Sequence, residues 1–116
     1  MNDLSAGLKN WGCDVDATME RMLHDQTLFI LCIHQVANDP VFEALGNALE
    51  QHQAAEAFDY AHTLKGILAT TGMTPLYTTV CQMVECLRVG SIEESPKLYT
   101  LLLEQREKLR QILAEG

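Results

Sequence analysis

The three prolines of the chain constrain its fold more than any other feature, because each one marks the start of a helix. Each follows a residue type that commonly caps a helix N-terminus, in the pairs Asp39-Pro40, Thr74-Pro75 and Ser95-Pro96. Proline is tolerated at the first helical position, since the N–H that it lacks would have no partner within the helix. Gly72 and Gly90 stand shortly before two of these pairs, where glycine commonly ends a helix. The pattern therefore predicts helices that begin at the prolines.

Between these boundaries, apolar residues recur at three- and four-residue steps, as amphipathic helices require. No run of β-branched residues alternates with polar ones over the length of a strand. Short connections favour antiparallel neighbours, so we expect an all-α fold, an antiparallel up-and-down four-helix bundle with one or two extra short N-terminal helices, as one domain over residues 1–116. The predicted helices span residues 3–10, 16–37 (with a break near His24-Asp25 left open), 40–52, 54–70, 75–89 and 96–114.

The net charge, the apolar runs and the cysteines indicate which partners and which cellular compartment the protein has. The chain has 16 acidic and 8 basic residues and a net charge of −8, whereas nucleic acids and anionic membranes are bound by basic surfaces. The first eleven residues are polar and mixed, so we expect no signal peptide, and the longest apolar run, residues 28–33, is too short to span a bilayer. Cys13, Cys32, Cys81 and Cys86 form no C-x-x-C pair, so we expect reduced thiols that act as small hydrophobes. These features predict a cytoplasmic protein with neither nucleic acid nor membrane as partner.

The stretch AHTLKG at residues 61–66 places a histidine, a lysine and a glycine inside a predicted helix. Glycine there costs about 1 kcal/mol relative to alanine. On a helical wheel, the apolar residues of this segment share one direction, and His62 lies roughly 130° away from it. We therefore expect the side chain of His62 to be exposed. The residues that define the core-facing direction are Ala57, Ala61, Leu64 and Leu68.

The neighbours of His62 on the same helical face are small or cationic. Gly66 lies four residues after it, while Ala55 and Ala69 lie seven residues before and after it. Lys65 stands one turn away, where its ammonium group can neutralise an anion held on the ring. Imidazole is a usable nucleophile near neutral pH. The pattern suits a histidine that is approached by something large, such as the surface of another protein.

These residues resemble a known family. HTLKG at residues 62–66, followed by Gly72, is similar to the H-x-x-K-G…G signature of histidine-containing phosphotransfer (HPt) domains. WGCDVD at residues 11–16 and MERMLHD at residues 19–25 resemble the opening segment of many such domains. AAEAF at residues 54–58 resembles the run into their active histidine. The resemblance covers essentially the whole chain, in the expected helical order.

The resemblance implies a monomeric helical bundle whose histidine takes a phosphoryl group from a receiver-domain aspartate and passes it to another. Carried over to this sequence, His62 becomes the phosphorylated residue, Lys65 the residue that stabilises the phosphoryl group, and Gly66 the point of docking clearance. The docking surface would also include Ala55, Ala69 and Asp59. The implied partners are response-regulator receiver domains and a hybrid sensor histidine kinase. The family has no cofactor or metal of its own, since the receiver supplies an acidic pocket and Mg²⁺.

One position departs from the family pattern. Many members place a polar residue, often glutamine, on the following helix, where it hydrogen-bonds the second ring nitrogen of the histidine. Counting from Gly72, that position falls at Val84, while Gln82 and Glu85 face other directions on an ideal helix. Either the helix register differs or another group orients the ring. Asp59, three residues before His62, is one candidate.

Other functions are less well supported by the residues. Di-metal bundles use Glu-x-x-His motifs, and no Glu here has a His three residues on. We expect no metal site, with the other three histidines, His24, His34 and His52, at the surface. No glycine-rich phosphate loop is present, so the chain is expected to carry phosphoryl groups and not to phosphorylate itself with ATP.

The principal alternative is an HPt-like adaptor that binds a receiver or another partner without phosphotransfer. The intact set of His62, Lys65 and Gly66 disfavours it. A hydrolase or transferase that uses His62 as general base would need convergent polar groups that the sequence does not supply. The initial methionine and the length favour a stand-alone protein, with a piece of a hybrid kinase left open.

Overall fold

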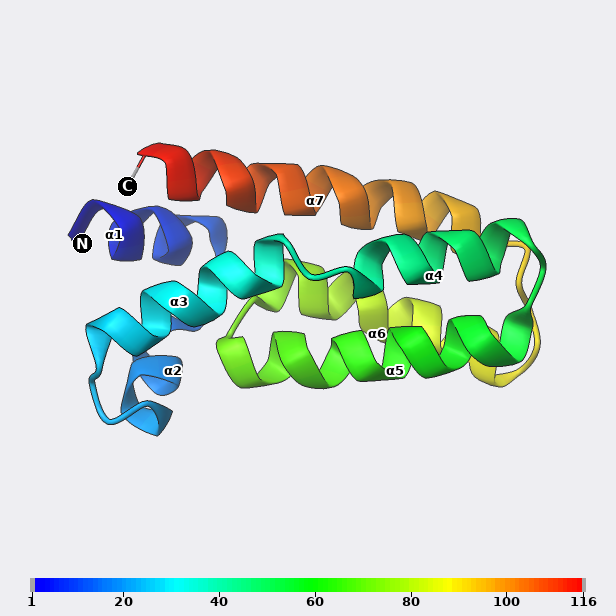
Figure 1. Cartoon of the computed structure of the whole chain (residues 1–116), viewed down its shortest axis with the longest axis horizontal. Coiled ribbons are helices and arrows are strands. Elements are labelled where there is room, and N and C mark those ends of the chain that lie inside the picture. The colour runs from blue at the N-terminus through cyan, green and yellow to red at the C-terminus, as the bar shows by residue number, and fades with distance from the viewer. Residues whose placement is uncertain (1, 116) are drawn as a thin grey trace.

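The computed structural model describes residues 2–115, and this part of the chain forms helices and connecting turns without any strand (Figure 1). The predicted all-α fold is confirmed. The predicted bounds agree with the observed ones to within two residues, and the long segment 16–37 is divided near His24-Asp25. The helices in the described residues are α1 (Asn2–Trp11), α2 (Val15–Arg21), α3 (Gln26–Ala37), α4 (Val41–Glu50), α5 (Ala54–Thr71), α6 (Thr74–Arg88) and α7 (Ser95–Glu115).

The break between α2 and α3 has a backbone cause. Leu23 and His24 both adopt left-handed conformations, with φ of 54° and 59°, which end the first helix. Asp25 then caps the next one, because its side chain accepts a hydrogen bond of 3.0 Å from the backbone N–H of Leu28.

The expected capping roles of Thr74 and Ser95 are wrong by one residue. Thr74 and Ser95 are the first helical residues of α6 and α7, so each following proline is the second residue of its helix. The second position tolerates proline for the same reason as the first, since the first four N–H groups of a helix have no intrahelical partner. The start of α4 is also displaced by one residue, because Pro40 is the N-cap and Val41 the first helical residue. The Asp39 carboxylate still accepts a hydrogen bond of 2.9 Å from Val41 N–H.

The helices pack mainly on their neighbours in the chain. Helix α3 leads into α4 along one side of the molecule, and α4, α5, α6 and α7 each contact the next (Figure 1). Helix α4 also contacts α7, while α1 packs on α7 and α2 packs on α1 and α3. All of these helices contribute to one apolar core, whose largest fully buried side chains include Phe29, Phe42, Leu64, Met83 and Leu109. The described part of the chain is compact, measuring 42 × 24 × 21 Å.

Taken together, α3 and α4 form the one helical stretch among the described residues, Gln26–Glu50, that is long and apolar enough to cross a membrane by length and composition. This stretch is longer than the uninterrupted apolar run at residues 28–33, because it continues across residues 38–40. Length and apolar composition alone are weak support for a membrane span, since core helices of soluble proteins meet the same two criteria. Here α3 and α4 have only 12 and 10 residues, against about 20 for a spanning helix.

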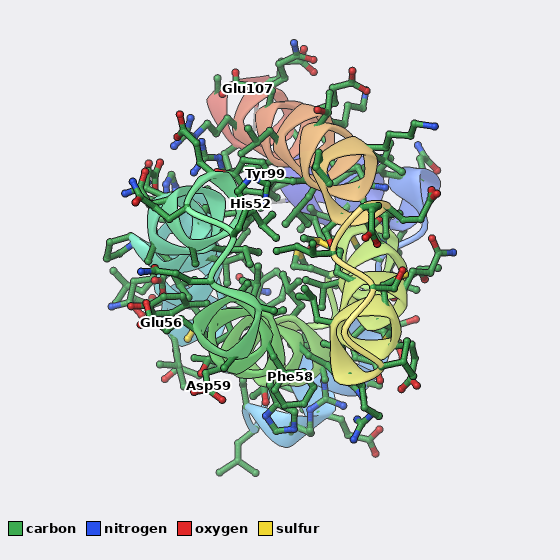
Figure 2. The ribbon with its side chains drawn as sticks, turned by 90° about the vertical axis from the view of Figure 1, so that its right-hand side faces the viewer. His52, Glu56, Phe58, Asp59, Tyr99 and Glu107 are labelled. Atoms are coloured by element: carbon green, nitrogen blue, oxygen red, sulfur yellow. The ribbon has the colours of Figure 1, made fainter. Side chains whose placement is uncertain are left out.

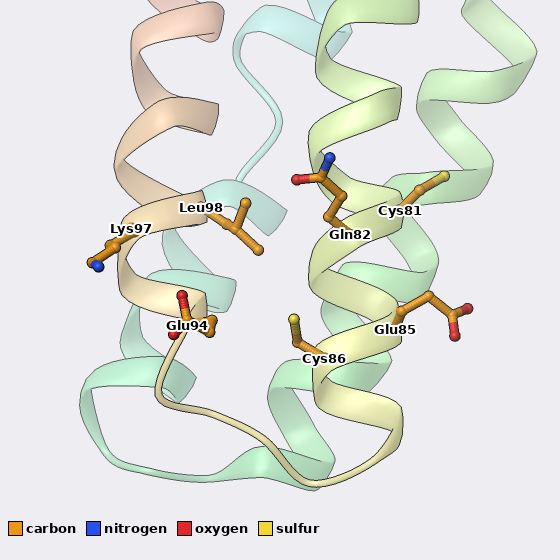
Figure 3. Close-up of a pocket in the computed structure, with 7 residues that line it drawn as sticks. All are labelled: Cys81, Gln82, Glu85, Cys86, Glu94, Lys97 and Leu98. Carbon is orange, nitrogen blue, oxygen red and sulfur yellow. The ribbon is translucent and has the colours of Figure 1, made fainter.

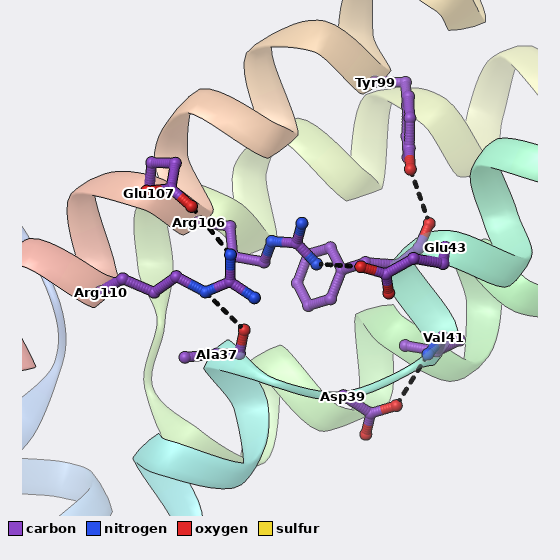
Figure 4. A network of polar contacts seen from close by, with 9 residues as sticks. Ala37, Asp39, Val41, Glu43, Tyr99, Arg106, Glu107 and Arg110 are labelled. Atoms are coloured by element: carbon purple, nitrogen blue, oxygen red, sulfur yellow. Dashed lines mark hydrogen bonds and ion pairs between the residues drawn. The ribbon is translucent and has the colours of Figure 1, made fainter.

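Three side chains of α7 hold the junction between α3 and α4 (Figure 4). Arg110 Nε donates a hydrogen bond of 3.2 Å to the carbonyl of Ala37, the last residue of α3. Arg106 pairs with Glu43 at 2.9 Å and lies 4.8 Å from the centre of the Phe42 ring. The hydrogen bond and charge of Arg106 lower the pKa of Glu43. Tyr99 donates a hydrogen bond of 2.8 Å to the carbonyl of Phe42, and Arg110 also pairs with Glu107 at 2.8 Å.

The turn between α5 and α6 packs against the start of α2. Gly72 has φ of 74°, and a Cβ at this position would collide with the Thr18 side chain and the Asp14 backbone. The backbone N–H of Asp14 donates a hydrogen bond of 2.9 Å to the Gly72 carbonyl. Arg21 donates one of the same length to the carbonyl of Thr70, which lies in the last turn of α5. Glycine is therefore required here both by conformation and by space.

Two glycines inside helices provide a matched test of the packing. At Gly46 in α4, an added Cβ would lie 2.6 Å from Cζ of Tyr99, whereas at Gly66 in α5 it would meet no atom within 4 Å. Gly46→Ala should lower the free energy of unfolding by about 1–3 kcal/mol. Gly66→Ala should raise it by up to about 1 kcal/mol, because alanine is the better helix former. Urea unfolding followed by circular dichroism measures both, and equal effects of the two variants would contradict the packing at Tyr99.

Candidate functional site

His62 projects from the middle of α5 into solvent. Its side chain is exposed, while the four residues predicted to face the core are completely buried. The helical wheel is therefore confirmed at this position. The buried residues of the opposite face are Ala57, Ala61, Leu64 and Leu68.

The surface beside His62 is open. Ala55, Gly66 and Ala69 are exposed, and the space around Gly66 holds no atom within 4 Å of the place where a Cβ would be. Lys65, one turn from His62, is half-buried. Its apolar stem can lie along the helix surface while its ammonium group stays in water. The predicted lane of small residues is thus present along α5, with a cation next to it.

Asp59 is exposed, but no hydrogen bond or ion pair in the described part of the chain connects it to His62. In the end-on view of Figure 2, Asp59 and Phe58 leave α5 in different directions, Phe58 on the side nearer α6. No contact in the described residues therefore supports a role for Asp59 in orienting the imidazole. A carboxylate at this position instead adds negative charge to the exposed side of α5.

The residue that does contact the imidazole is Phe58, four residues before His62. The two ring centres lie 5.9 Å apart and the ring planes differ by 30°, which is a stacked arrangement. Arg88, near the end of α6, places its guanidinium carbon 5.4 Å from the centre of the Phe58 ring. Sequence reasoning missed both residues. The i−4 spacing could have revealed Phe58, whereas Arg88 depends on the register between two helices.

The position where many family members carry a polar residue is apolar here. Val84 is completely buried. Gln82 and Glu85 are exposed, as the helical wheel indicates, and they line a groove of about 670 Å³ between α6 and the start of α7 (Figure 3). Glu85 also forms an ion pair of 3.6 Å with Arg88. The ring of His62 therefore has no polar partner from α6 among the residues that the structure describes.

The other metal-ligating and nucleophilic residue types are dispersed. His24, His34 and His52 are exposed and lie on separate segments. Within residues 2–115, no three side chains of His, Cys, Asp or Glu are grouped so that they could hold a metal ion. Cys13 is buried, and burial raises the pKa of its thiol to about 12, so it remains protonated. Cys32, Cys81 and Cys86 are half-buried free thiols, so only Cys13 fully matches the expected small core hydrophobe.

The arrangement is therefore an exposed imidazole on a convex helix surface, with a cation one turn away and room above it. It can act on a group that a second macromolecule presents to it.

Comparison with known proteins agrees with this geometry. The family model described as Hpt domain matches residues 33–114, which run from the middle of α3 to near the end of α7 and include the whole of α5. No significant match was found among curated proteins or among solved structures. The family model covers more than half of the 116 residues. The chain therefore belongs to the Hpt domain family.

Proposed function

We propose that the chain is a phosphoryl carrier of a two-component phosphorelay, in which His62 accepts a phosphoryl group from the aspartate of one receiver domain and passes it to that of another. Membership of the Hpt family supports a phosphotransfer-related role in two-component signalling. The single observation that carries the finer proposal is the exposed His62, one helical turn from Lys65 and beside the open surface at Gly66.

The proposed step is a transfer between two side chains. A ring nitrogen of His62 attacks the phosphorus atom, the bond from phosphorus to the aspartyl oxygen breaks, and the carboxylate leaves with the electron pair of that bond. The return step reverses these changes with the carboxylate of the second receiver. Lys65 lies where its positive charge can stabilise the phosphoryl oxygens on the ring. We propose that Mg²⁺ comes with the receiver and that this chain binds no cofactor of its own.

The same proposal covers the domain organisation, the oligomeric state, the partners and the location of the protein. Residues 1–116 would be one domain and a monomer, with α4 to α7 forming the antiparallel up-and-down bundle that presents His62. Hpt domains generally interact with receiver domains in phosphorelays. The receiver would dock on the exposed side of α5, over a surface made by Ala55, Asp59, Gly66 and Ala69. A hybrid sensor histidine kinase is a further proposed partner, and the cytoplasm is the proposed location.

The proposal is tested first at His62. Incubation with a phosphorylated receiver should transfer acid-labile, base-stable label to the wild-type chain, and His62→Ala should abolish this transfer because the attacking nitrogen is gone. His24→Ala, which removes another exposed histidine, is the matched control and should transfer normally. Stable binding of receivers without any label on the wild-type chain would instead identify a non-transferring adaptor.

Lys65 is tested with a variant that keeps its apolar stem. Lys65→Met should slow transfer or shorten the lifetime of the phosphohistidine about tenfold, because a charge-assisted contact to the phosphoryl group is lost. The free energy of unfolding should change by no more than about 0.5 kcal/mol. Lys108→Met, at an exposed position on α7, is the control. Equal transfer rates for the two variants would show that residue 65 has no part in the reaction.

Gly66 is tested by separating stability from docking. Gly66→Ala places a methyl group in space that is open in the free protein. The variant should be more stable, as predicted above, but the rate of transfer from receivers should fall at least about fivefold, because the methyl group obstructs docking. Phosphorylation by the small donor phosphoramidate should stay unchanged, since that molecule needs no clearance. Normal transfer from receivers would place the docking contact elsewhere.

A further inference from the structure

We infer that Phe58, itself held by Arg88, positions the imidazole of His62 for phosphoryl transfer. The inference rests on the proposed function of His62 and answers a question that the family pattern leaves open in this chain. The residue that would orient the ring by a hydrogen bond from α6 is replaced by the buried Val84. The structure assigns the same task to an aromatic contact within α5.

The contact has the geometry of a specific interaction. A centre-to-centre distance of 5.9 Å and an interplanar angle of 30° lie within the range of stacked aromatic pairs. Phe58 and His62 are four residues apart on one helix, so the backbone itself brings their rings together. The imidazole has only two side-chain torsions. A ring packed against one of its faces therefore removes much of the rotational freedom that an exposed histidine would otherwise have.

Phe58 is in turn held from the neighbouring helix. The guanidinium carbon of Arg88 lies 5.4 Å from the centre of the Phe58 ring, close enough for a cation–π interaction. Glu85, one turn earlier on α6, pairs with Arg88 at 3.6 Å. Phe58 is half-buried, and it also packs against the apolar core. The contacts thus run from Glu85 through Arg88 and Phe58 to His62, and they couple the register of α5 and α6 to the position of the imidazole.

Stacking has a chemical consequence that a hydrogen bond would not have. A stacked phenyl ring contacts the face of the imidazole and uses neither of its nitrogen atoms. No other group among the described residues hydrogen-bonds the ring of His62. Both nitrogens therefore stay available, one to attack phosphorus and the other to exchange its proton with solvent or with a group on the partner.

The first experiment measures the contact without any partner. Phe58→Leu keeps much of the side-chain volume and removes the ring, whereas Phe58→Tyr keeps the ring and should rescue. In NMR spectra, the carbon-bound ring protons of His62 should shift in Phe58→Leu, because the ring current of the phenyl group is lost, and should return toward wild type in Phe58→Tyr. Tyr60→Leu, which removes another aromatic residue of α5, should leave these resonances in place. Unmoved resonances in Phe58→Leu would overturn the stacking.

The second experiment measures its effect on reactivity. Phosphorylation of His62 by phosphoramidate, and transfer from a phosphorylated receiver, should both slow about two- to tenfold in Phe58→Leu and recover in Phe58→Tyr. A shift of the resonances with wild-type rates would overturn the positioning role. If Phe58→Leu fails to fold, Arg88→Met replaces it, since this exposed residue contacts the ring from outside the core. Arg88→Met should move the same resonances and slow the same reaction, and an unchanged variant would overturn the proposal.

The two proposals fail in different ways. If no receiver transfers a phosphoryl group to the wild-type chain, the proposed function is wrong, while the resonances of His62 and its reaction with phosphoramidate still report on Phe58. If wild-type transfer is normal and Phe58→Leu reacts like wild type, the positioning role alone is wrong.

Discussion

The two-residue turn at Gly72 and Met73 fixes the relation between α5 and α6, and the surroundings of His62 depend on it. A connection this short leaves little freedom in the register of the two helices. Gly72 is locked by its left-handed conformation and by contact with the start of α2. From this register follow the burial of Val84 and the position of Arg88 over Phe58. Gly72 thus acts at a distance, by setting which residue of α6 lies over Phe58, the neighbour of the histidine.

Helix-interior glycines serve opposite purposes on the two sides of the bundle. At Gly46 the absence of a Cβ lets the ring of Tyr99 lie against α4, which adds a packing contact inside the protein. At Gly66 nothing fills the space, so the helix carries the cost of glycine without any packing gain. Under the proposed function, this open space is where a receiver would come close to the helix.

The fold could be predicted from sequence because its signals are local. Prolines, glycines and the spacing of apolar residues determine where helices begin and end, and the same spacing placed His62 outside the core. The errors at Thr74 and Ser95 are of one residue, since proline suits either of the first two positions of a helix. What the sequence did not reveal depends on contacts between helices. Arg106 reads as one charge among many in α7, yet its side chain is 11% exposed because it covers Phe42 and pairs with Glu43.

The contact between Phe58 and the imidazole is an exception, because both residues belong to α5. The sequence favours a hydrogen-bonding residue such as Asp59, because polar side chains commonly hold histidine rings and Asp59 lies one turn before His62. In the sequence, a phenylalanine four residues before the histidine looks like a core residue. Phe58 does pack on the core. Phe58 also contacts the imidazole, and Arg88 at the end of α6 lies over its ring. An aromatic residue at a core boundary can therefore support a reactive side chain and the fold at once.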